Sequence, residues 1–417
     1  MLAASASPCR VDAAGSVGRD AIEQDVIVDA AIDIIVRNGL AGLTLRPLAA
    51  SLGVSVAAVS ARMGTKEQLV DRVIDVAAQR DQRFFERWAS FAVQVAPSDA
   101  AARAALADLA FRDWMTTTRR QAILLIEVVH HHALHEGPSR TVERWLAQAG
   151  AFWSTLVFGS AALADLALGY VLDEAGFALG AGDDSAYVLL RVLCLQRFAD
   201  GLRPRGDTSG AAIERLIAML EPDGLAVTAV DDPKRQRIAD SAARIIVSQG
   251  MNAATHRSVA LAAEVPASTV VYHFGGRDAL VVAGLHAVIA RFHGTRKRAA
   301  GTAPGDDTEA RDLVKATSMI ALASVREPSL QPFALDMRRR RGENIRATDL
   351  ASLGFGPHAD GGFGPHADAG FDRATAQVIS IALFGMRMVA MSRKLPEQAC
   401  YRAAFAALDA WNDERTR

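Results

Sequence analysis

The chain has 417 residues, half of them hydrophobic, which is enough material for two hydrophobic cores. Its 46 basic and 47 acidic side chains give a net charge of −1, which excludes a uniformly basic protein, so any contact with nucleic acid must come from local clusters. Three cysteines without CxxC spacing (Cys9, Cys194 and Cys400) argue against a disulfide framework or a zinc site and favour the reducing cytoplasm. Alanine and leucine abound and alternating β-branched runs are scarce, so an all-α fold is predicted.

The N-terminal part of the chain predicts a short tail followed by a run of helices. Residues 1–20 contain no apolar core segment, so we expect a disordered tail and not a secretory signal. From Ala21 to Arg37 apolar residues recur at helical spacing, and Asn38-Gly39 stops this helix. The stretch from Leu43 to Leu69 predicts two short helices joined by a turn, and a long helix then begins at Lys66. Further helices are expected at about 66–92, 98–117, 119–136, 138–150, 151–172, 184–201 and 211–220.

A second stretch, from Ala254 to Leu280, has the same plan as the stretch from Leu43 to Leu69. The two stretches are offset by 211 residues, which is the separation of Thr44 and Thr255. The matching holds without gaps at eleven positions, so the chain contains an internal duplication. The helices expected in the second half lie at about 234–249, 255–262, 267–273, 277–299, 307–326, 330–345, 372–393 and 397–413. The eleven residues of the first copy that recur are Ile34, Ile35, Val36, Gly39, Thr44, Arg46, Ala49, Val54, Val59, Gly64 and Leu69.

Both stretches resemble the N-terminal DNA-binding head of the TetR family of bacterial transcription regulators. The first copy keeps the family's residues at Thr44, Arg46, Ala49, Gly53-Val54-Ser55 and Lys66-Glu67-Gln68-Leu69. It has Ser60, Arg62 and Met63 where the family has Tyr, His and Phe. The second copy keeps Thr255, Arg257, Ala260 and Tyr272-His273-Phe274, but has Glu264, Pro266 and Val271 where Gly, Ser and Tyr are usual, and Arg277-Asp278 for Lys-Glu.

The resemblance implies two tandem units, each a three-helix helix-turn-helix head followed by a helical body for ligand binding and dimerisation. We expect the tail at 1–20, head 1 at 21–70, body 1 at 71–222, a linker at 223–233, head 2 at 234–281, and body 2 at 282–417 with a flexible loop at 351–371. In the family the last two helices of each body form a four-helix bundle with those of a partner. Here we expect the two helix pairs to pack together within one chain as a pseudo-dimer; a homodimer is the alternative. The pairs are 151–172 with 184–201, and 372–393 with 397–413.

The resemblance also indicates which residues contact double-stranded DNA. Backbone N–H groups and basic side chains at a helix start can hold a phosphate, and short side chains of the second helix can meet base edges. The phosphate candidates are Thr44, Arg46 and Lys66 in head 1, and Thr255, Arg257 and Arg277 in head 2. The base-facing candidates are Ser55, Val56, Ala57 and Ser60, and Ala267, Ser268, Thr269, Tyr272 and His273. Charges balance to zero between Asp25 and Val70 but to +2 between Asp232 and Leu280, so head 2 is predicted to bind DNA more strongly.

Other features of the sequence receive plainer interpretations. His131 and His135 share a helical face with metal-ligand spacing, but no acidic or cysteine partner accompanies them, so pocket or surface histidines are favoured over a metal site. The run from Arg338 to Arg341 is expected to form a solvated face; contact with an acidic ligand or with DNA is the alternative. In the repeated GFGPHAD segment, His358, Asp360, His366 and Asp368 are attributed to a surface loop and not to a metal site. The apolar segments 151–172 and 378–391 carry Asp165, Gly159, Gly385 and Arg387, which favours core helices over membrane spans.

No nucleophile elbow, phosphate loop or paired-carboxylate pattern appears, so neither an enzyme nor a cofactor is predicted. The expected function is that of a cytoplasmic transcriptional regulator, in particular a repressor that responds to a small, largely apolar effector. The alternative is a ligand-binding or protein-interaction module whose heads no longer bind DNA. The incomplete Tyr-x-His-Phe pattern of the first copy favours this alternative.

Overall fold

The computed structural model describes residues 23–135, 137, 139–202, 210–222, 232–299, 307–343, 372–415 and 417, with side chains placed except at 291–299 and 307–309. Within these residues the chain forms helices and turns and no strand, which confirms the all-α prediction. The expected tail at 1–20, nearly all of the linker at 223–233 and the loop at 351–371 lie outside the described residues.

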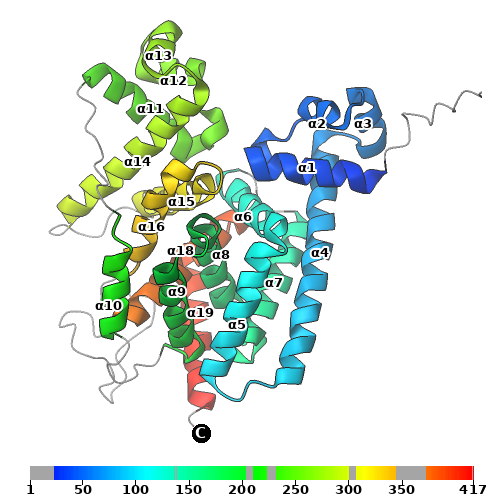
Figure 1. Ribbon diagram of the computed structural model, residues 1–417, viewed down its shortest axis with the longest axis vertical. Coiled ribbons are helices and arrows are strands. Elements are labelled where there is room, and N and C mark those ends of the chain that lie inside the picture. Colours follow the sequence, from blue (N-terminus) through cyan, green and yellow to red (C-terminus); the bar gives the residue numbers. More distant parts are fainter. Residues whose placement is uncertain are drawn as a thin grey trace, which may run out of the picture.

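In the first half, three helices form head 1 and a long helix, α4, carries the chain into body 1 (Figure 1). Thr65 and Gln68 start α4 with a capping box, in which each side chain accepts a hydrogen bond from the other's backbone N–H. The elements are α1 Gln24–Asn38, η1 Leu40–Gly42, α2 Leu45–Leu52, α3 Val56–Met63, α4 Lys66–Val95, α5 Ala100–Thr116, α6 Arg119–Leu134, α7 Arg140–Phe158, η2 Ala161–Leu163, α8 Ala164–Ala181, α9 Ser185–Ala199 and α10 Gly210–Met219.

The second half repeats the head and has a shorter body. Asp232 caps its first helix by accepting the backbone N–H groups of Lys234 and Arg235, and Pro233 suits the first turn because it needs no donor there. The elements are α11 Pro233–Gln249, η3 Met251–Ala253, α12 His256–Ala263, α13 Ala267–Phe274, α14 Arg277–Ala299, α15 Asp307–Ser324, η4 Pro328–Leu330, α16 Gln331–Arg339, α18 Arg373–Arg393 and α19 Glu397–Glu414.

One predicted helix boundary is wrong. The sequence placed a break between residues 150 and 151, but α7 continues to Phe158 and the chain turns at Gly159, whose φ of +73° suits a left-handed helix cap. Gly150 has a different role. A Cβ atom there would lie 3.0 Å from the Ala164 carbonyl oxygen, so this glycine allows α7 and α8 to approach closely.

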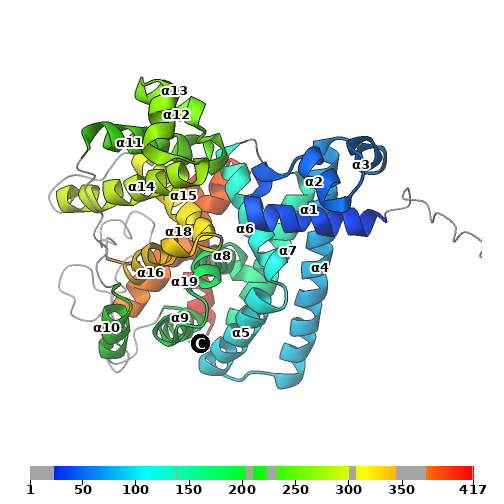
Figure 2. The same ribbon diagram turned by 45° about the horizontal axis from the view of Figure 1, so that its top comes forward.

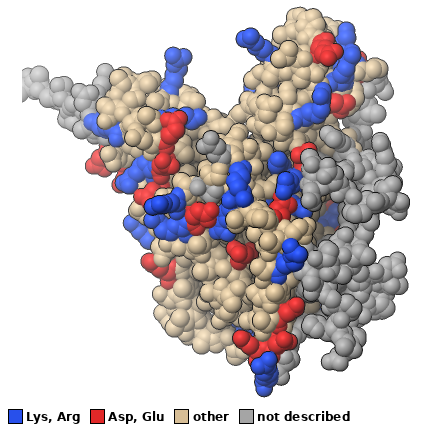
Figure 3. All heavy atoms as spheres, turned by 180° about the vertical axis from the view of Figure 1, so that it is seen from behind, with Lys and Arg blue, Asp and Glu red and all other residues tan. Residues whose placement is uncertain are grey.

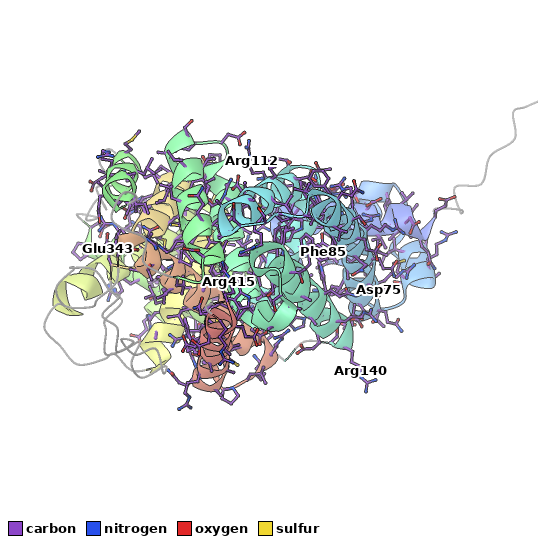
Figure 4. The ribbon with its side chains drawn as sticks, turned by 90° about the horizontal axis from the view of Figure 1, so that it is seen from below. Asp75, Phe85, Arg112, Arg140, Glu343 and Arg415 are labelled. Carbon is purple, nitrogen blue, oxygen red and sulfur yellow. The ribbon has the colours of Figure 1, made fainter. Side chains whose placement is uncertain are left out.

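Both heads lie at the same end of the molecule, with the two bodies beneath them (Figures 1 and 2). Helix α4 descends from head 1 along one edge of body 1. Viewed from below, Phe85 lies among the helices of body 1, whereas the side chains of Arg112 and Arg140 lie at its periphery (Figure 4). The two heads are therefore presented together, away from the packed bodies.

Aromatic side chains fill the interior of body 1 between α4, α5 and α7. Phe85 stacks on Phe152 with ring centroids 4.6 Å apart, and Trp114 and Trp153 pack at 5.7 Å. The fully buried Asp81 accepts the indole N–H of Trp114 at 3.1 Å and that of Trp145 at 2.9 Å. Burial raises the pKa of Asp81 to about 7, although the two indole hydrogen bonds act in the opposite direction.

The two halves pack through equivalent helices. The most extensive contact between helices joins α8 to α18; in addition, α6 packs on α18 and α15 packs on α8, as a two-fold relation between the halves requires. The helix that follows each of these two also crosses to the other half: α9 contacts α18, and α19 contacts α8. The expected pair 372–393 and 397–413 corresponds to α18 and α19, which pack on α8 and α9 of the same chain. Of the expected helix 151–172, only residues 164–172 belong to the interface helix α8, because residues 151–158 continue α7.

The arginine run 338–341 does not form a solvated face, so that prediction was wrong. Arg338 is fully buried and pairs with Glu174 of α8 at 2.9 Å, while Arg341 pairs with Asp173 at 2.8 Å. Arg339 and Arg340 both bond to Asp336 on their own helix. A buried arginine is tolerated where a carboxylate balances its charge, and α8 supplies two carboxylates from the other half of the chain.

Among the described helices, α18 alone is long and apolar enough to cross a membrane by length and composition. In the fold, 78% of its apolar window is buried inside the protein. The helix therefore has a place in the core, as the sequence predicted for this segment.

Candidate nucleic-acid interface

In head 1, α2 and α3 form a helix-turn-helix unit around a small core. Gly53 ends α2 in the left-handed conformation (φ +66°), and the Ser55 hydroxyl caps α3 by accepting the Ala58 backbone N–H at 3.1 Å. Leu48 and Val59 are buried and hold the two helices on α1. The turn therefore fixes the angle between the helices and leaves one side of α3 in solvent.

Head 2 builds the same unit with different turn chemistry. The Thr255 hydroxyl caps α12 by accepting the Ser258 backbone N–H at 3.1 Å, as its sequence position predicts. Glu264 occupies the left-handed position (φ +55°) that glycine holds in head 1, and Pro266 precedes α13. Val270 and Phe274 are buried and anchor α13 to its head.

Most base-facing candidates lie on the exposed side of α3 or α13. Ser55, Val56 and Ala57 are exposed at the start of α3, as are Ala267 and Ser268 at the start of α13. Ser60 and Thr269 are half-buried, and the ring of Tyr272 is 85% exposed. The N-terminal ends of both helices therefore offer short side chains to a ligand outside the protein.

The family model described as "Bacterial regulatory proteins, tetR family" matches the chain twice, over residues 27–73 and 238–283. Each match spans the first three helices of one half and the start of the fourth. The chain belongs to the TetR family and carries two of its heads in tandem. It is therefore a TetR-type DNA-binding transcription regulator. A search of curated proteins finds no match.

Two phosphate candidates are free on the surface of the TetR heads. Arg46 and Arg257 lie in the first turns of α2 and α12, are exposed, and have no ion-pair partner among the described side chains. Thr44 and Thr255 precede these helices as equivalent caps, but Thr44 makes no side-chain cap bond. Its hydroxyl and the first N–H groups of α2 are therefore open to an anion.

The two candidates at the start of the fourth helix differ. Lys66 is half-buried in the first turn of α4. Arg277, its counterpart, donates to the Met251 carbonyl at 3.1 Å and to Asn252 Oδ1 at 2.9 Å, within its own head. The guanidinium of Arg277 thus ties α14 to η3, and this use competes with phosphate binding.

His273 is also engaged within its TetR head. Its Nδ1 lies 3.4 Å from Asp232 Oδ2, and only 13% of its side chain is exposed. The ring faces the start of α11, away from the exposed side of α13 on which Tyr272 projects. The structure instead exposes Val271 of α13 by 47% and Leu261 of α12 by 82%. Neither residue was among the base-facing candidates predicted from the sequence. The available signal was an apolar residue outside the 3.6-residue stripe of its helix.

The difference in net charge between the two heads disappears when the count includes arginines outside head 1 that form ion pairs with its acidic residues. In head 1, Asp29 pairs with Arg80 of α4 at 2.7 Å, and Asp33 pairs with Arg120 of α6 at 2.8 Å. Neither arginine belongs to the counted window from Asp25 to Val70. Including both raises the balance of head 1 from zero to +2, equal to that of head 2. Figure 3 shows the heads as separate lobes, each with basic side chains at its surface.

The second half also holds head 1 directly. Arg326, which follows α15, donates to the Val36 carbonyl at 2.8 Å and the Ile35 carbonyl at 3.2 Å, at the end of α1. It also forms an ion pair with Glu127 of α6. The Val36 carbonyl lies in the last turn of α1, where carbonyl groups lack partners within the helix, whereas the Ile35 carbonyl also accepts the Gly39 backbone N–H at 2.8 Å. Arg326 therefore helps to complete the end of α1 from 290 residues away along the chain.

Proposed function

We propose that this protein is a cytoplasmic, ligand-responsive repressor that binds one operator through its two non-identical heads. The observation that carries the proposal is the placement of both helix-turn-helix units at one end of the molecule, each with the start of its second helix exposed. TetR-type dimers present two heads in this way, and their operators contain two half-sites about one helical turn apart. Here one chain supplies both heads.

We infer that the working unit is a single chain, because the contact between the halves is chemically one-sided. Helix α8 brings the carboxylates of Asp173 and Glu174, and the segment at the end of α16 brings the guanidinium groups of Arg338 and Arg341. A homodimer that paired α8 with its own copy would set four carboxylates against each other without these arginines. Such like-charge contacts cost several kcal/mol, by order of magnitude, and select against that assembly.

The operator is expected to be asymmetric. The residues exposed at the start of α3 are Ser55, Val56 and Ala57, whereas α13 begins with Ala267 and Ser268 and carries the exposed ring of Tyr272. Side chains of different shape and hydrogen-bonding capacity select different base edges in the major groove. The two half-sites should therefore differ in sequence.

We propose that a small effector controls repression by shifting the equilibrium between different arrangements of the two heads. A ligand that binds one arrangement of the heads more tightly than another shifts the protein toward that arrangement, and operator affinity changes with it. The interior of body 1 is already filled by aromatic side chains such as Phe85, Phe152 and Trp153. A small apolar effector entering there would have to displace them.

Selection of an operator from random DNA, followed by footprinting and light scattering, tests this function. We expect salt-dependent binding to two unequal half-sites and a mass of 44.3 kDa for the free protein. A perfect palindrome as the tightest site, or a mass of twice that value, contradicts the single-chain assembly. If no sequence is enriched and binding does not depend on salt, the chain acts as a ligand or protein-interaction module instead.

A further inference from the structure

A cleft of about 70 Å³ opens between the two heads. The same corner of each copy lines it, residues 38–41 from head 1 and residues 249–252 from head 2, which are 211 positions apart in the sequence. Helices α6 and α15, which occupy equivalent positions in the two halves, contribute the remaining lining residues. The cleft therefore lies where both heads and both bodies meet.

Its two sides differ in chemistry. Helix α15 contributes the apolar side chains of Met319 and Leu322. Helix α6 contributes Glu127, His130, His131 and Leu134, and His135 follows at its end. Glu127 is already occupied by Arg326 and by the Leu40 backbone N–H, which it accepts at 3.3 Å. No group of three or more metal-binding side chains occurs among the described residues. A ligand with one polar and one apolar end suits this surface.

His130 is the unsatisfied group of the cleft. It is only 8% exposed, and its Nε2 atom has no hydrogen-bond partner in the described part of the chain. Burial lowers the pKa of His130, although Glu127 and a hydrogen bond to the Lys315 backbone act in the opposite direction, so the ring is neutral at pH 7. A hydrogen bond to the Lys315 backbone favours a proton on the other ring nitrogen, so the lone pair of Nε2, which is itself buried, is left without a donor. A buried acceptor without a donor is costly, and a bound donor would relieve that cost.

We propose that this cleft binds a small neutral ligand that donates a hydroxyl or amide hydrogen to His130 Nε2 and packs its apolar part against Met319 and Leu322. The volume accommodates about five non-hydrogen atoms, at roughly 10–15 Å³ each, and longer ligands can extend into solvent. The site deepens the proposed function, on which its regulatory role rests, and places the effector between the heads instead of inside a body.

The location couples occupancy of the cleft to the spacing of the heads. The Asn252 side chain of head 2 donates to the Asn38 carbonyl of head 1 at 3.5 Å across the cleft. The two lining corners lead directly into the caps of α2 and α12, Thr44 and Thr255. A ligand in the cleft therefore stabilises one separation of the two DNA-binding units and changes operator affinity.

Butan-1-ol and its isomer 1-methoxypropane test the site without DNA, because they have similar shapes but only the alcohol donates a hydrogen bond. In ligand-observed NMR titrations of the full chain, the alcohol should bind saturably and about five- to tenfold more tightly than the ether. His130→Phe should remove this preference. His286→Phe is the matched control, because His286 Nε2 also lacks a partner but the ring packs on Phe333, outside the cleft lining. Non-saturable binding, equal binding of both isomers, or an equal loss in both variants overturns the site.

A second variant keeps the test decisive if His130→Phe does not fold, as judged by circular dichroism. Leu134→Trp should fill the cleft from α6 and abolish alcohol binding without altering His130; unchanged binding rejects the site. On a selected operator, butan-1-ol should change the affinity of the wild type severalfold but not that of either cleft variant. Alcohol binding without an effect on operator affinity rejects the regulatory role, whereas a chain that binds the alcohol but no DNA rejects the repressor function alone.

Discussion

Gly169 of α8 and Gly385 of α18 lie backbone to backbone where the two halves of the chain cross. A Cβ atom on Gly385 would overlap the Gly169 carbonyl oxygen, and one on Gly169 would lie 2.7 Å from the Ala382 carbonyl oxygen. Side chains elsewhere on α8 and α18 interdigitate around this point, among them Leu166, Leu172 and Met386, all buried. The crossing therefore determines how close the two halves come.

Gly385→Ala should destabilise the protein by about 2–3 kcal/mol, because the clash is with backbone and cannot be relieved by a rotamer change. Urea unfolding measures this. Gly176→Ala on α8 is the control, since its new Cβ would lie 3.4 Å from that of Ala321, an ordinary contact. A neutral Gly385→Ala would show that the helices can separate at little cost.

Arg338→Met should cost about 3–5 kcal/mol, because Glu174 would be left buried without its counter-charge. Adding Glu174→Gln should restore part of that loss, since the amide still accepts the Tyr187 hydroxyl, which bonds to Glu174 at 2.7 Å. The double-mutant cycle is read from unfolding free energies. Strictly additive losses would mean that the two side chains do not depend on one another.

Glu264→Gly should stabilise head 2 by about 1 kcal/mol, because a side chain in the left-handed conformation is strained and glycine is not. The equivalent change in head 1, Gly53→Ala, should destabilise by a similar amount through strain alone, as nothing lies within 4 Å of the new Cβ. Thermal unfolding of both variants tests the pair. Effects of the same sign would contradict the equivalence of the two turns.

The stability of body 1 should fall as pH rises toward neutrality. Asp81 has a folded pKa of about 7 against 3.8 for the ordinary carboxyl, so the folded state holds its proton more tightly. Its contribution is complete below pH 3.8 and is lost between pH 3.8 and 7, by about 1.4 kcal/mol per pH unit. Asp81→Asn removes this titration, so unfolding free energies from pH 5 to 8 should slope less in the variant. Parallel slopes would exclude Asp81 as the cause.

Arg46→Ala and Arg257→Ala should weaken operator binding to a similar extent, each reducing the salt dependence by about one phosphate contact. Equality is expected because Arg80 and Arg120 neutralise the acids of head 1, so the heads carry equal net charge. Arg140→Ala, an exposed change in body 1, is the control. A much larger loss from Arg257→Ala would favour the simpler charge count made on the sequence, in which head 2 dominates.

The internal duplication, the helix-turn-helix heads and most helix ends were predictable from the sequence. Each depends on residues a few positions apart: Thr255 caps its own helix, Gly53 ends its own helix, and Val59 and Val270 fall on the inner stripe of theirs. A pattern that repeats every 3.6 residues, or a cap that bonds three residues ahead, is visible in a short window.

The roles of the charged residues were decided only by the tertiary structure. Arg338 pairs with Glu174, which lies 164 residues away in the sequence, and Arg326 bonds to the end of α1 from 290 residues away. Arg120 pairs with Asp33 of head 1, which lies 87 residues away. His130 faces a cleft that exists only because the two heads meet. A charge or an unsatisfied nitrogen acts on whatever the fold brings within a few ångströms, and no local pattern in the sequence records that partner.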